Sequence, residues 1–350
     1  MPGSKHLAQE IRTLALEEGF ARVGIASAGP VRGREMFDEW LLSGGHADMS
    51  YLARNVSKRF CPSLLVEGAQ SVICLAIGYC PTMDRVQGSP SQSMPFVARY
   101  ARGRDYHDLL RERCKSLIGR IRTLAPQLRA RAFVDSAPLA ERSLAAMSGV
   151  GWIGRNGCLI VPGLGSYVFL AEIVCNLKLP ADGAIEPGCG TCDACCRACP
   201  TGACVGNSLI DARKCLSYLT IEHHGPIDRS YRPLLGSRIF GCDTCQEVCP
   251  YNQKIPAGDA DLLSLPEMPP GRPAIHQTPL AEILTYGYED WDSGTSGSAM
   301  RRVGHGKLIE NAVIAAGCSG DAKLKVPLRA LSADRPGLSE LIRWALNRLE

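Results

Sequence analysis

Two runs of closely spaced cysteines carry the clearest chemistry in this sequence. The first run, at residues 189–200, contains the spacing C-x2-C-x2-C-x3-C-P in a single register, and the second, at residues 242–250, has the shorter spacing C-x2-C-x3-C-P. The first spacing is the bacterial ferredoxin pattern, in which three thiolates bind one four-iron cubane and the fourth binds its neighbour. The runs therefore predict two [4Fe-4S] clusters that pass electrons one at a time.

Two cubanes need eight thiolates, and the two runs supply seven in register. We expect the eighth from Cys215, which lies between the runs in a stretch, residues 211–220, that reads as helical. The last cysteine of each run is assigned to the other cluster, as in ferredoxins. One cluster is then expected on Cys189, Cys192, Cys195 and Cys249, and the other on Cys199, Cys215, Cys242 and Cys245. Cys196 and Cys204 lie outside the register.

A zinc ribbon is the alternative, because paired C-x2-C motifs also bind zinc. Zinc needs neither a third thiolate at two-residue spacing nor the Cys-Pro ending that both runs share. Cysteine makes up 17 of 350 residues, and residues 1–19 do not resemble an export signal, so metal is favoured over disulfides. No apolar run is long enough to cross a bilayer, and we expect a cytoplasmic protein with no membrane partner.

One acid stands where proton transfer could occur. Asp135 ends a predicted strand, residues 131–135, and strand ends in α/β folds face the crevices in which substrates bind. A carboxyl group there could act as a proton donor. The alternative is an N-cap, because Asp is a favoured cap and a predicted helix at residues 139–147 follows closely.

A basic segment is the only marked charge asymmetry. Residues 99–131 hold ten Lys and Arg against three Asp and Glu, a local charge of +7 in a chain whose net charge is +4. A local basic block in a nearly neutral chain suits a polyanion such as RNA. The alternative is the solvated face of a helix predicted at residues 105–124.

The remaining sequence must position these groups. Apolar residues are 45% of the chain and charged residues 21%, as in folded proteins. Helical and strand patterns alternate up to about residue 180, whereas residues 181–256 hold ten cysteines and little strand signal. Residues 81–95 read as a loop and residues 257–275 as a proline-rich linker. The expected helices are 5–19, 34–42, 105–124, 139–147, 307–316 and 337–348, and the expected strands are 23–26, 71–79, 131–135, 158–161 and 167–176.

The ordered motifs around the cysteines resemble the epoxyqueuosine reductases, cobalamin- and iron–sulfur-dependent enzymes of tRNA queuosine synthesis. The resemblance covers most of the chain and rests on residues 99–107, 134–142, 149–156, 165–172, 211–222 and 236–245. It implies an α+β fold in three parts. These are a nitroreductase-like domain for cobalamin and substrate at residues 1–180, a ferredoxin-like two-cluster domain at 181–256, and a linker with a short HEAT-like helical segment at 257–350.

The resemblance also implies a reaction and its residues. Epoxyqueuosine at the tRNA wobble position would lose its epoxide oxygen as water, with two electrons and two protons entering. An external flavodoxin- or ferredoxin-type donor would supply the electrons, and we expect a monomer. Asp135 matches the family's proton donor, beside the corrin. Asp105, Tyr106, His107 and Arg142 match residues around the modified base, and Arg59, Leu159, Leu170, Ser217 and Asp243 match positions near the cobalamin.

The sequence departs from the family pattern at two places. Some members carry a cysteine where Ala98 stands here, and many carry arginine where Glu310 precedes Asn311. Two other classes compete. A reductive dehalogenase shares cobalamin and clusters but typically carries a twin-arginine signal, which is missing here. A plain ferredoxin-like carrier would not need the 180 residues ahead of the clusters.

Overall fold

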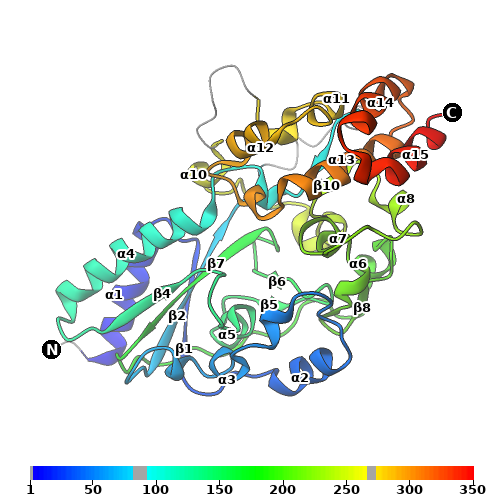
Figure 1. The fold of residues 1–350 in the computed structure, drawn as a ribbon. Helices are drawn as coiled ribbons and strands as arrows, with labels where there is room; N and C mark the ends of the chain where they lie inside the picture. The colour runs from blue at the N-terminus through cyan, green and yellow to red at the C-terminus, as the bar shows by residue number, and fades with distance from the viewer. Residues whose placement is uncertain (1–2, 82–92, 266–272) are drawn as a thin grey trace.

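A four-stranded antiparallel sheet organises the first half of the molecule (Figure 1). The structure, a computed structural model, describes residues 3–81, 93–265 and 273–350. The strand order is β1-β2-β7-β4, and Ile73 pairs with both Ile25 and Ile173 across the centre of the sheet. The strands are β1 (Arg22–Ser27), β2 (Ser71–Gly78), β4 (Ala130–Phe133) and β7 (Val168–Cys175). The corresponding expected strands are confirmed, and so is the α+β class.

Helices cover both faces of this sheet. Side chains alternate along a strand, so Ile25, Ile73 and Ile173 share one face. The helices α1 (Ser4–Glu17) and α4 (Tyr106–Leu124) pack on that face, as expected from their apolar spacing. Val72, Phe133 and Val174 belong to the hydrophobic cluster of the opposite face. That face is covered by α5 (Glu141–Met147) and the hairpin of β5 (Trp152–Ile153) and β6 (Leu159–Ile160).

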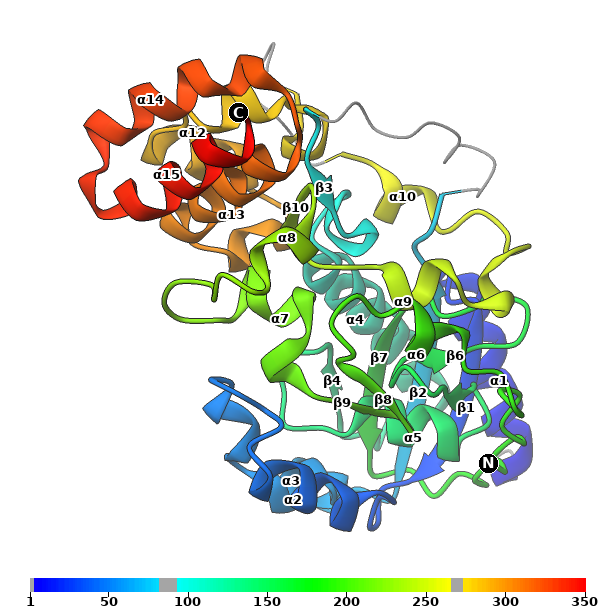
Figure 2. The same ribbon diagram turned by 90° about the vertical axis from the view of Figure 1, so that its right-hand side faces the viewer.

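The predicted loop at residues 81–95 falls mainly on residues 82–92, which lie outside the described residues. After it, β3 (Phe96–Val97) pairs in parallel with β10 (Arg238–Phe240), and this pairing joins the sheet half of the chain to the cysteine-rich region. The helices α2 (Arg34–Leu42) and α3 (Val56–Arg59) lie at the opposite end of the molecule from the C-terminal helices in both Figure 1 and Figure 2.

The cysteine-rich region is built from short elements. It contains α6 (Ala194–Ala198), β8 (Cys204–Gly206), β9 (Leu209–Ile210), α7 (Leu216–Ile221), α8 (Arg232–Leu235), β10 and α9 (Thr244–Glu247). The continuous helix expected over residues 211–220 is wrong. A 3-10 turn at Ala212–Lys214, capped by Asp211, ends at Cys215, whose backbone is extended at φ −70° and ψ 122° before α7 begins. Cys215 thus stands at a break between two helical turns.

The C-terminal segment is more helical than expected. The helices predicted at 307–316 and 337–348 are confirmed as α13 (His305–Cys318) and α15 (Ser339–Arg348). The helix α14 (Lys325–Asp334) was not predicted. It contains Pro327, which argues against a helix in general but is tolerated in the first helical turn. Three further helices were not expected: α10 (Ala260–Leu263), α11 (Leu280–Ile283) and α12 (Tyr288–Thr295).

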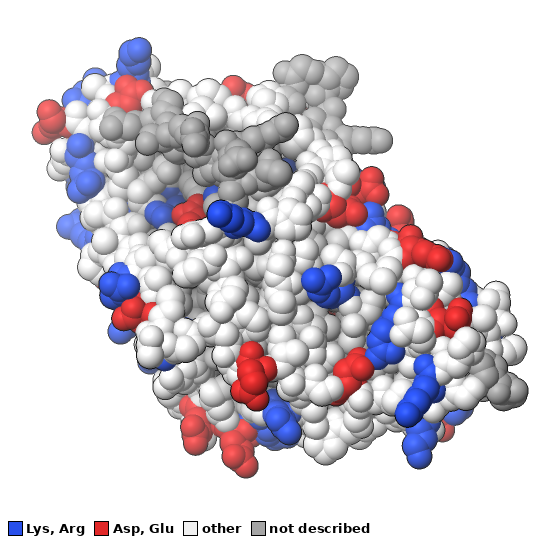
Figure 3. All heavy atoms as spheres, turned by 180° about the vertical axis from the view of Figure 1, so that it is seen from behind, with Lys and Arg blue, Asp and Glu red and all other residues white. Residues whose placement is uncertain are grey.

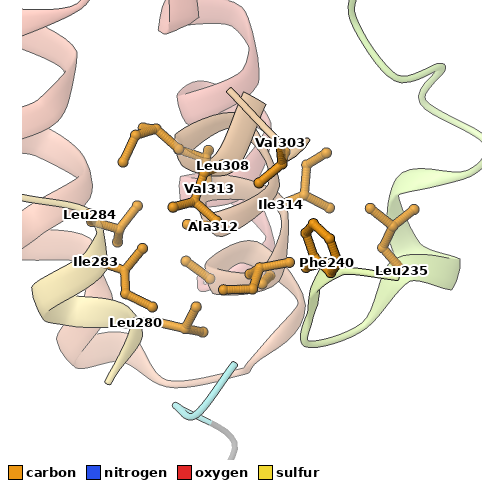
Figure 4. Close-up of a cluster of buried hydrophobic side chains, with 14 of the residues drawn as sticks. Leu235, Phe240, Leu280, Ile283, Leu284, Val303, Leu308, Ala312, Val313 and Ile314 are labelled. Atoms are coloured by element: carbon orange, nitrogen blue, oxygen red, sulfur yellow. The ribbon is translucent and has the colours of Figure 1, made fainter. Parts of the chain in front are cut away.

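One hydrophobic cluster joins these helices to the cysteine-rich region (Figure 4). Figure 4 shows Phe240 and Leu235 lying against the side of α13 that carries Ile314. The buried amide of Asn311 on α13 donates to the carbonyl oxygens of Thr220 (2.8 Å) and Ile239 (2.9 Å). The tail is therefore packed against α7 and β10 rather than tethered by its linker alone.

Part of the proline-rich segment is also fixed in place. Asp259 caps α10 and binds the guanidinium of Arg113 on α4, and Leu262 is buried in the cluster that contains α4. Residues 266–272 of the expected linker lie outside the described residues. The division of the chain at residues 180 and 256 stays a prediction.

Candidate active site

Asp135 lies in a tight turn just beyond the sheet. The strand β4 ends at Phe133, two residues earlier than expected, and Asp135 adopts the left-handed conformation with φ 56°. Its backbone N–H donates to Glu141 Oε1 at 2.7 Å. The N-cap alternative is wrong, because the residue at the N-cap of α5 is Ala140 and no side chain caps that helix. The Asp135 side chain is 62% exposed, so a substrate can reach it.

The first turn of α4 brings three of the predicted residues to this acid. Asp105 caps α4 by accepting from the His107 N–H at 3.0 Å, and its carboxylate also contacts His107 Nδ1 at 2.7 Å. The other ring nitrogen, Nε2, lies 3.3 Å from Asp135 Oδ2, and the Tyr106 hydroxyl donates to the same oxygen at 3.1 Å. Tyr106 stacks on Phe169 of β7, with ring centroids 4.0 Å apart, which fixes its position.

The electrostatics of this chain of residues place a proton on the imidazole. Burial opposes the charge of His107, but hydrogen bonds to Asp105 and Asp135 outweigh burial and raise the pKa of His107 to about 9. The hydrogen bond from His107 in turn lowers the pKa of Asp135. Near neutral pH the pair is therefore an imidazolium beside a carboxylate, with one shared proton available at an exposed position.

Two acids near Asp135, the partly buried Glu141 and the buried Glu172, were not expected from the sequence. Burial and the charge of Asp135 raise the pKa of Glu141 to about 7, and burial and Glu141 raise the pKa of Glu172. Glu172 is fully buried on β7, directly opposite Phe133 of β4. The one available sequence signal was Glu172, an acid inside the otherwise apolar segment that forms β7. A buried carboxyl group needs a partner, so such an acid indicates a second polar group nearby.

The C-terminal segment also reaches this site, which nothing in the sequence indicated. Arg302 binds Glu222 through two hydrogen bonds, at 2.8 and 2.9 Å, and its guanidinium lies over the Tyr51 ring at 5.8 Å. Its positive charge contributes to lowering the pKa of Asp135 after the larger effects of His107 and Tyr106. Residues from three distant parts of the chain therefore surround Asp135.

The other predicted substrate residue, Arg142, is placed differently. Its guanidinium donates to the carbonyl oxygen of Gly157, in the loop before β6. Within the described residues it makes no hydrogen bond to Asp105, Tyr106, His107 or Asp135. Arg142 follows Glu141 on α5. It is therefore close to the Asp135 turn, but it is not part of the hydrogen-bonded series that links Asp105, His107 and Asp135.

The residues predicted to line a cobalamin site fit such a group in part. Leu159 and Leu170 belong to the same hydrophobic cluster, on the α5 face of the sheet. Arg59 ends α3, and its buried Nε has no partner within the described residues. An orphaned buried donor next to an apolar wall suits a large, amide-bearing ligand.

Two further residues predicted near the corrin, Asp243 and Ser217, are less accessible to a ligand. Asp243 is buried, and its Oδ2 accepts from the backbone N–H of Arg99 at 2.8 Å and from its guanidinium at 3.1 Å. Ser217 lies in the first turn of α7, two residues after Cys215, and is partly buried.

Nearby thiols contribute to the pKa values of two of the predicted cluster cysteines, Cys249 and Cys215. Burial raises the pKa of the Cys249 thiol, and the neighbouring thiols of Cys189, Cys192 and Cys245 add to this effect. In the same way burial raises the pKa of Cys215 to about 11, with contributions from Cys242 and Cys245. The helices α6 and α9, which carry cysteines of the two runs, pack against each other. Cys249 thus lies near cysteines of both runs, and Cys215 lies near the second run, to which the predicted pattern assigns it.

The Cys-Pro dipeptides explain how each run ends. Cys199 (φ −67°, ψ 114°) and Cys249 (φ −72°, ψ 123°) have nearly the same extended backbone, since a following proline disfavours the helical region. The chain therefore changes direction at each of these cysteines, directly after the short helices α6 and α9. Cys158 was not expected near the clusters, yet its thiol is within hydrogen-bonding reach of Cys245.

The basic segment at residues 99–131 is not one open basic surface. Arg99 is buried against Asp243 and Glu247, Arg113 binds Asp259, and Arg120 binds Glu17 and Glu18. Figure 3 shows basic and acidic side chains interspersed over one face of the molecule. Part of the local +7 is thus neutralised by acids from distant segments, and the exposed remainder includes Arg104 and Arg111.

These features define an iron–sulfur protein in which a double-cluster region is joined to an α+β domain with an acid–imidazole site. Residues 188–252 match the family of 4Fe-4S double cluster binding domains, and residues 59–136 match the family described as epoxyqueuosine reductase QueG, DUF1730. The chain is 40% identical to an epoxyqueuosine reductase of Pseudomonas aeruginosa, over 99% of this chain and 96% of the relative. It is 38% identical to the enzyme of that name from Escherichia coli, over 97% and 89% of the two chains.

Solved structures agree with this assignment. A crystal structure of epoxyqueuosine reductase with an epoxyqueuosine-modified tRNA-Tyr stem loop matches with a TM-score of 0.87 at 28% identity, over 98% of this chain and 90% of that one. A Bacillus subtilis epoxyqueuosine reductase, whose catalytic aspartate loop is swung out of the active site, matches with a TM-score of 0.84 at 27% identity, over 98% and 90% of the chains. The chain belongs to the epoxyqueuosine reductase family, an oxidoreductase family, which confirms the resemblance. In the described parts of the chain, no helix is both long and apolar enough to span a membrane.

Proposed function

We propose that this chain reduces epoxyqueuosine to queuosine in tRNA, with Asp135 as the group that protonates the departing epoxide oxygen. The observation that carries the proposal is the exposed Asp135 carboxylate, hydrogen-bonded to Tyr106 and to a protonated His107. An alkoxide is a poor leaving group unless a proton reaches it as the C–O bond breaks. The site offers a proton at an exposed position, which this reaction requires.

In this proposal the proton is stored on His107 and delivered through Asp135. Asp105 accepts from His107 Nδ1 and holds the imidazole in place, so Nε2 faces Asp135. When a substrate hydroxyl or alkoxide displaces solvent from the Asp135 carboxylate, the proton can move from Nε2 to Asp135 and on to the oxygen. The Tyr106 hydroxyl keeps the carboxylate oriented during the transfer.

The electrons are proposed to arrive through two [4Fe-4S] clusters. The ligands would be Cys189, Cys192, Cys195 and Cys249 for one cluster and Cys199, Cys215, Cys242 and Cys245 for the other. The proximity of Cys215 to Cys242 and Cys245 supports this partition, as does the proximity of Cys249 to Cys189 and Cys192; Cys249 also lies near Cys245 of its own run. Double-cluster ferredoxin folds cross their last ligands in the same way.

Cobalamin is the proposed reducing centre, held near Arg59, Leu159 and Leu170, with Ser217 and Asp243 at its margin. When bound, it would supply electrons to carbon for cleavage of the C–O bond. The unpartnered Arg59 Nε is available for a side-chain amide or phosphate of such a ligand. Arg142, beside Glu141, is proposed to contact the modified nucleoside from the α5 side.

The proposed partners are tRNA carrying epoxyqueuosine and an external electron donor of the flavodoxin or ferredoxin type. We propose that the protein acts as a monomer in the cytoplasm. The exposed basic residues Arg104 and Arg111 flank the α4 end that carries Tyr106 and His107, and they suit contact with the tRNA backbone.

The experiment is an anaerobic single-turnover assay with an epoxyqueuosine-containing anticodon stem loop, excess reductant and added cobalamin. The product nucleoside is quantified by mass spectrometry. We expect conversion to queuosine that depends on cobalamin and on intact clusters. Conversion without cobalamin would contradict the proposed reducing centre, and no conversion in its presence, with clusters loaded, would contradict the proposed substrate.

A further inference from the structure

Two cysteines outside the proposed cluster ligands face each other. Cys196 lies on α6 and Cys204 at the start of β8, and their sulfur atoms are 3.3 Å apart. Cys195, a proposed ligand of the first cluster, has its sulfur within 4.8 Å of both. Three sulfur atoms therefore gather at one edge of the cluster region, and the eight-ligand partition uses one of them.

Access to the two thiols is unequal. Cys204 is 5% exposed, packed where α6 meets β8, whereas Cys196 is partly exposed. The Cys204 sulfur also lies 3.7 Å from the Arg155 carbonyl oxygen, to which it donates. A small reagent in solution would thus meet Cys196 first, and Cys204 lies directly behind it.

The separation suits bond formation with little movement. The sulfur atoms of a disulfide lie ~2.0 Å apart, so these two would close by roughly 1.3 Å from their 3.3 Å contact. Rotation about the Cα–Cβ bonds supplies a movement of this size. The loop from Cys196 to Cys204 is short and already folded back on itself through the turn after Cys199, so closure costs little chain entropy.

We propose that Cys196 and Cys204 form a reversible disulfide that acts as a thiol-redox site beside the first cluster. This rests on the proposed ligand partition, in which neither thiol binds iron. The oxidant is a low-molecular-weight disulfide such as oxidised glutathione. The Cys196 thiol displaces one glutathione thiol and forms a mixed disulfide, and the Cys204 thiol then displaces the second. Two protein thiols are oxidised, one glutathione disulfide is reduced to two thiols, and no electrons are left over.

Thiol pairs with this arrangement in reducing compartments are typically transient and redox-sensing. The new bond would tie α6 to β8 immediately after Cys195. Oxidation would therefore change the backbone that presents a cluster ligand, without removing the ligand itself.

The test uses anaerobically loaded holoprotein treated with oxidised glutathione, then quenched in acid with N-ethylmaleimide. Tandem mass spectrometry maps the bonds, and iron is measured in parallel. We expect a Cys196–Cys204 disulfide, loss of about two reactive thiols, reversal by dithiothreitol and unchanged iron. In the Cys204→Ser variant we expect the Cys196–glutathione mixed disulfide to accumulate at least tenfold over wild type, because the second displacement is blocked.

Controls separate the proposal from the ligand partition on which it rests. Cys61→Ser replaces a partly exposed cysteine outside the cluster region and should form the disulfide as wild type does. A stable mixed disulfide at Cys196 in wild type, with Cys204 still reduced, would overturn the proposed pair. Loss of iron in Cys196→Ser or Cys204→Ser before any oxidation would show instead that these thiols are ligands, and would overturn the partition as well.

Discussion

The backbone N–H of Asp135 donates to the carboxylate of Glu141 at 2.7 Å, and this bond holds the proposed proton donor in a left-handed turn. A non-glycine residue adopts that conformation only when its surroundings fix it. Glu141 begins α5 and lies beneath the loop, so the helix and the loop are locked together.

We therefore expect Glu141→Ala to slow turnover by about fivefold, since the hydrogen bond that positions the loop is worth about 1 kcal/mol. Glu141→Gln keeps an acceptor oxygen and should restore most of the rate. Single-turnover rates at saturating tRNA measure the effect, with the melting temperature as a check on folding. A Gln variant as slow as the Ala variant would show that the charge of Glu141, and not its acceptor oxygen, matters.

Asp135→Asn should lower the single-turnover rate by roughly 10²–10⁴-fold, because the amide cannot deliver a proton. Iron content and cobalamin binding should stay at wild-type values. The matched control is Asp108→Asn, an exposed carboxylate in the first turn of α4, which should keep nearly full activity at saturating tRNA. Normal turnover in Asp135→Asn would rule out the proposed proton donor.

The rate should fall as pH rises through about 9, because the pKa of His107 is raised to about 9 and the site loses its stored proton above that value. Below it, His107 stays protonated and sets no further limit on the rate. The pKa of Glu141 is raised to about 7, so a change in rate near neutral pH would report on that carboxyl group. A pH profile of kcat/KM checks this. In His107→Gln the alkaline limb should vanish and the plateau should drop; an unchanged limb would assign it to another group.

Iron analysis of anaerobically purified protein should give about eight irons per chain, two times four. Cys215→Ala should lose about half of this iron, because it removes one ligand of the second cluster. Cys196→Ser is the matched control and should keep all of it. Zinc in place of iron, or full iron in Cys215→Ala, would contradict the two-cluster assignment.

Affinity for the tRNA stem loop should fall steeply with salt, and replacing both Arg104 and Arg111 with Ala should reduce the slope of log K against log salt by about 1.5. Both residues are exposed near the active-site end of α4. Arg122 lies in the last turn of the same helix, roughly 24 Å along the axis from Tyr106. The control variant Arg122→Ala should therefore leave the slope unchanged. Equal effects at both ends would indicate general electrostatic attraction without a defined footprint.

Local patterns in the sequence predicted the local structure well. The strands of the sheet, the helices α1, α4 and α5 and the two cysteine runs all follow from spacing that covers a few residues at a time. Resemblance to the family placed Asp105, Tyr106 and His107 beside Asp135, and the structure brings all four together. Spacing alone would have left Asp135 as a helix cap.

What the sequence could not predict depends on contacts between distant residues. Arg302 pairs with Glu222 near the site of Asp135, far from Arg302 in the sequence. Arg113 and Arg120 pair with the distant acids Asp259 and Glu18. The basic block therefore looked more open than it is. Glu141 and Glu172 become neighbours only when α5 folds onto the sheet, because the two lie on different elements.

The two hydrogen bonds from Asn311 have a thermodynamic consequence for assembly of the whole protein. They end on Thr220 and Ile239, in the two elements that adjoin Cys215 and Cys242. Any ligand that binds only the folded cysteine-rich region stabilises, by mass action, whatever is cooperatively attached to it. Iron loading should therefore protect the amides of α13 from hydrogen exchange. Exchange rates in this C-terminal helix would then show whether the iron–sulfur clusters are bound.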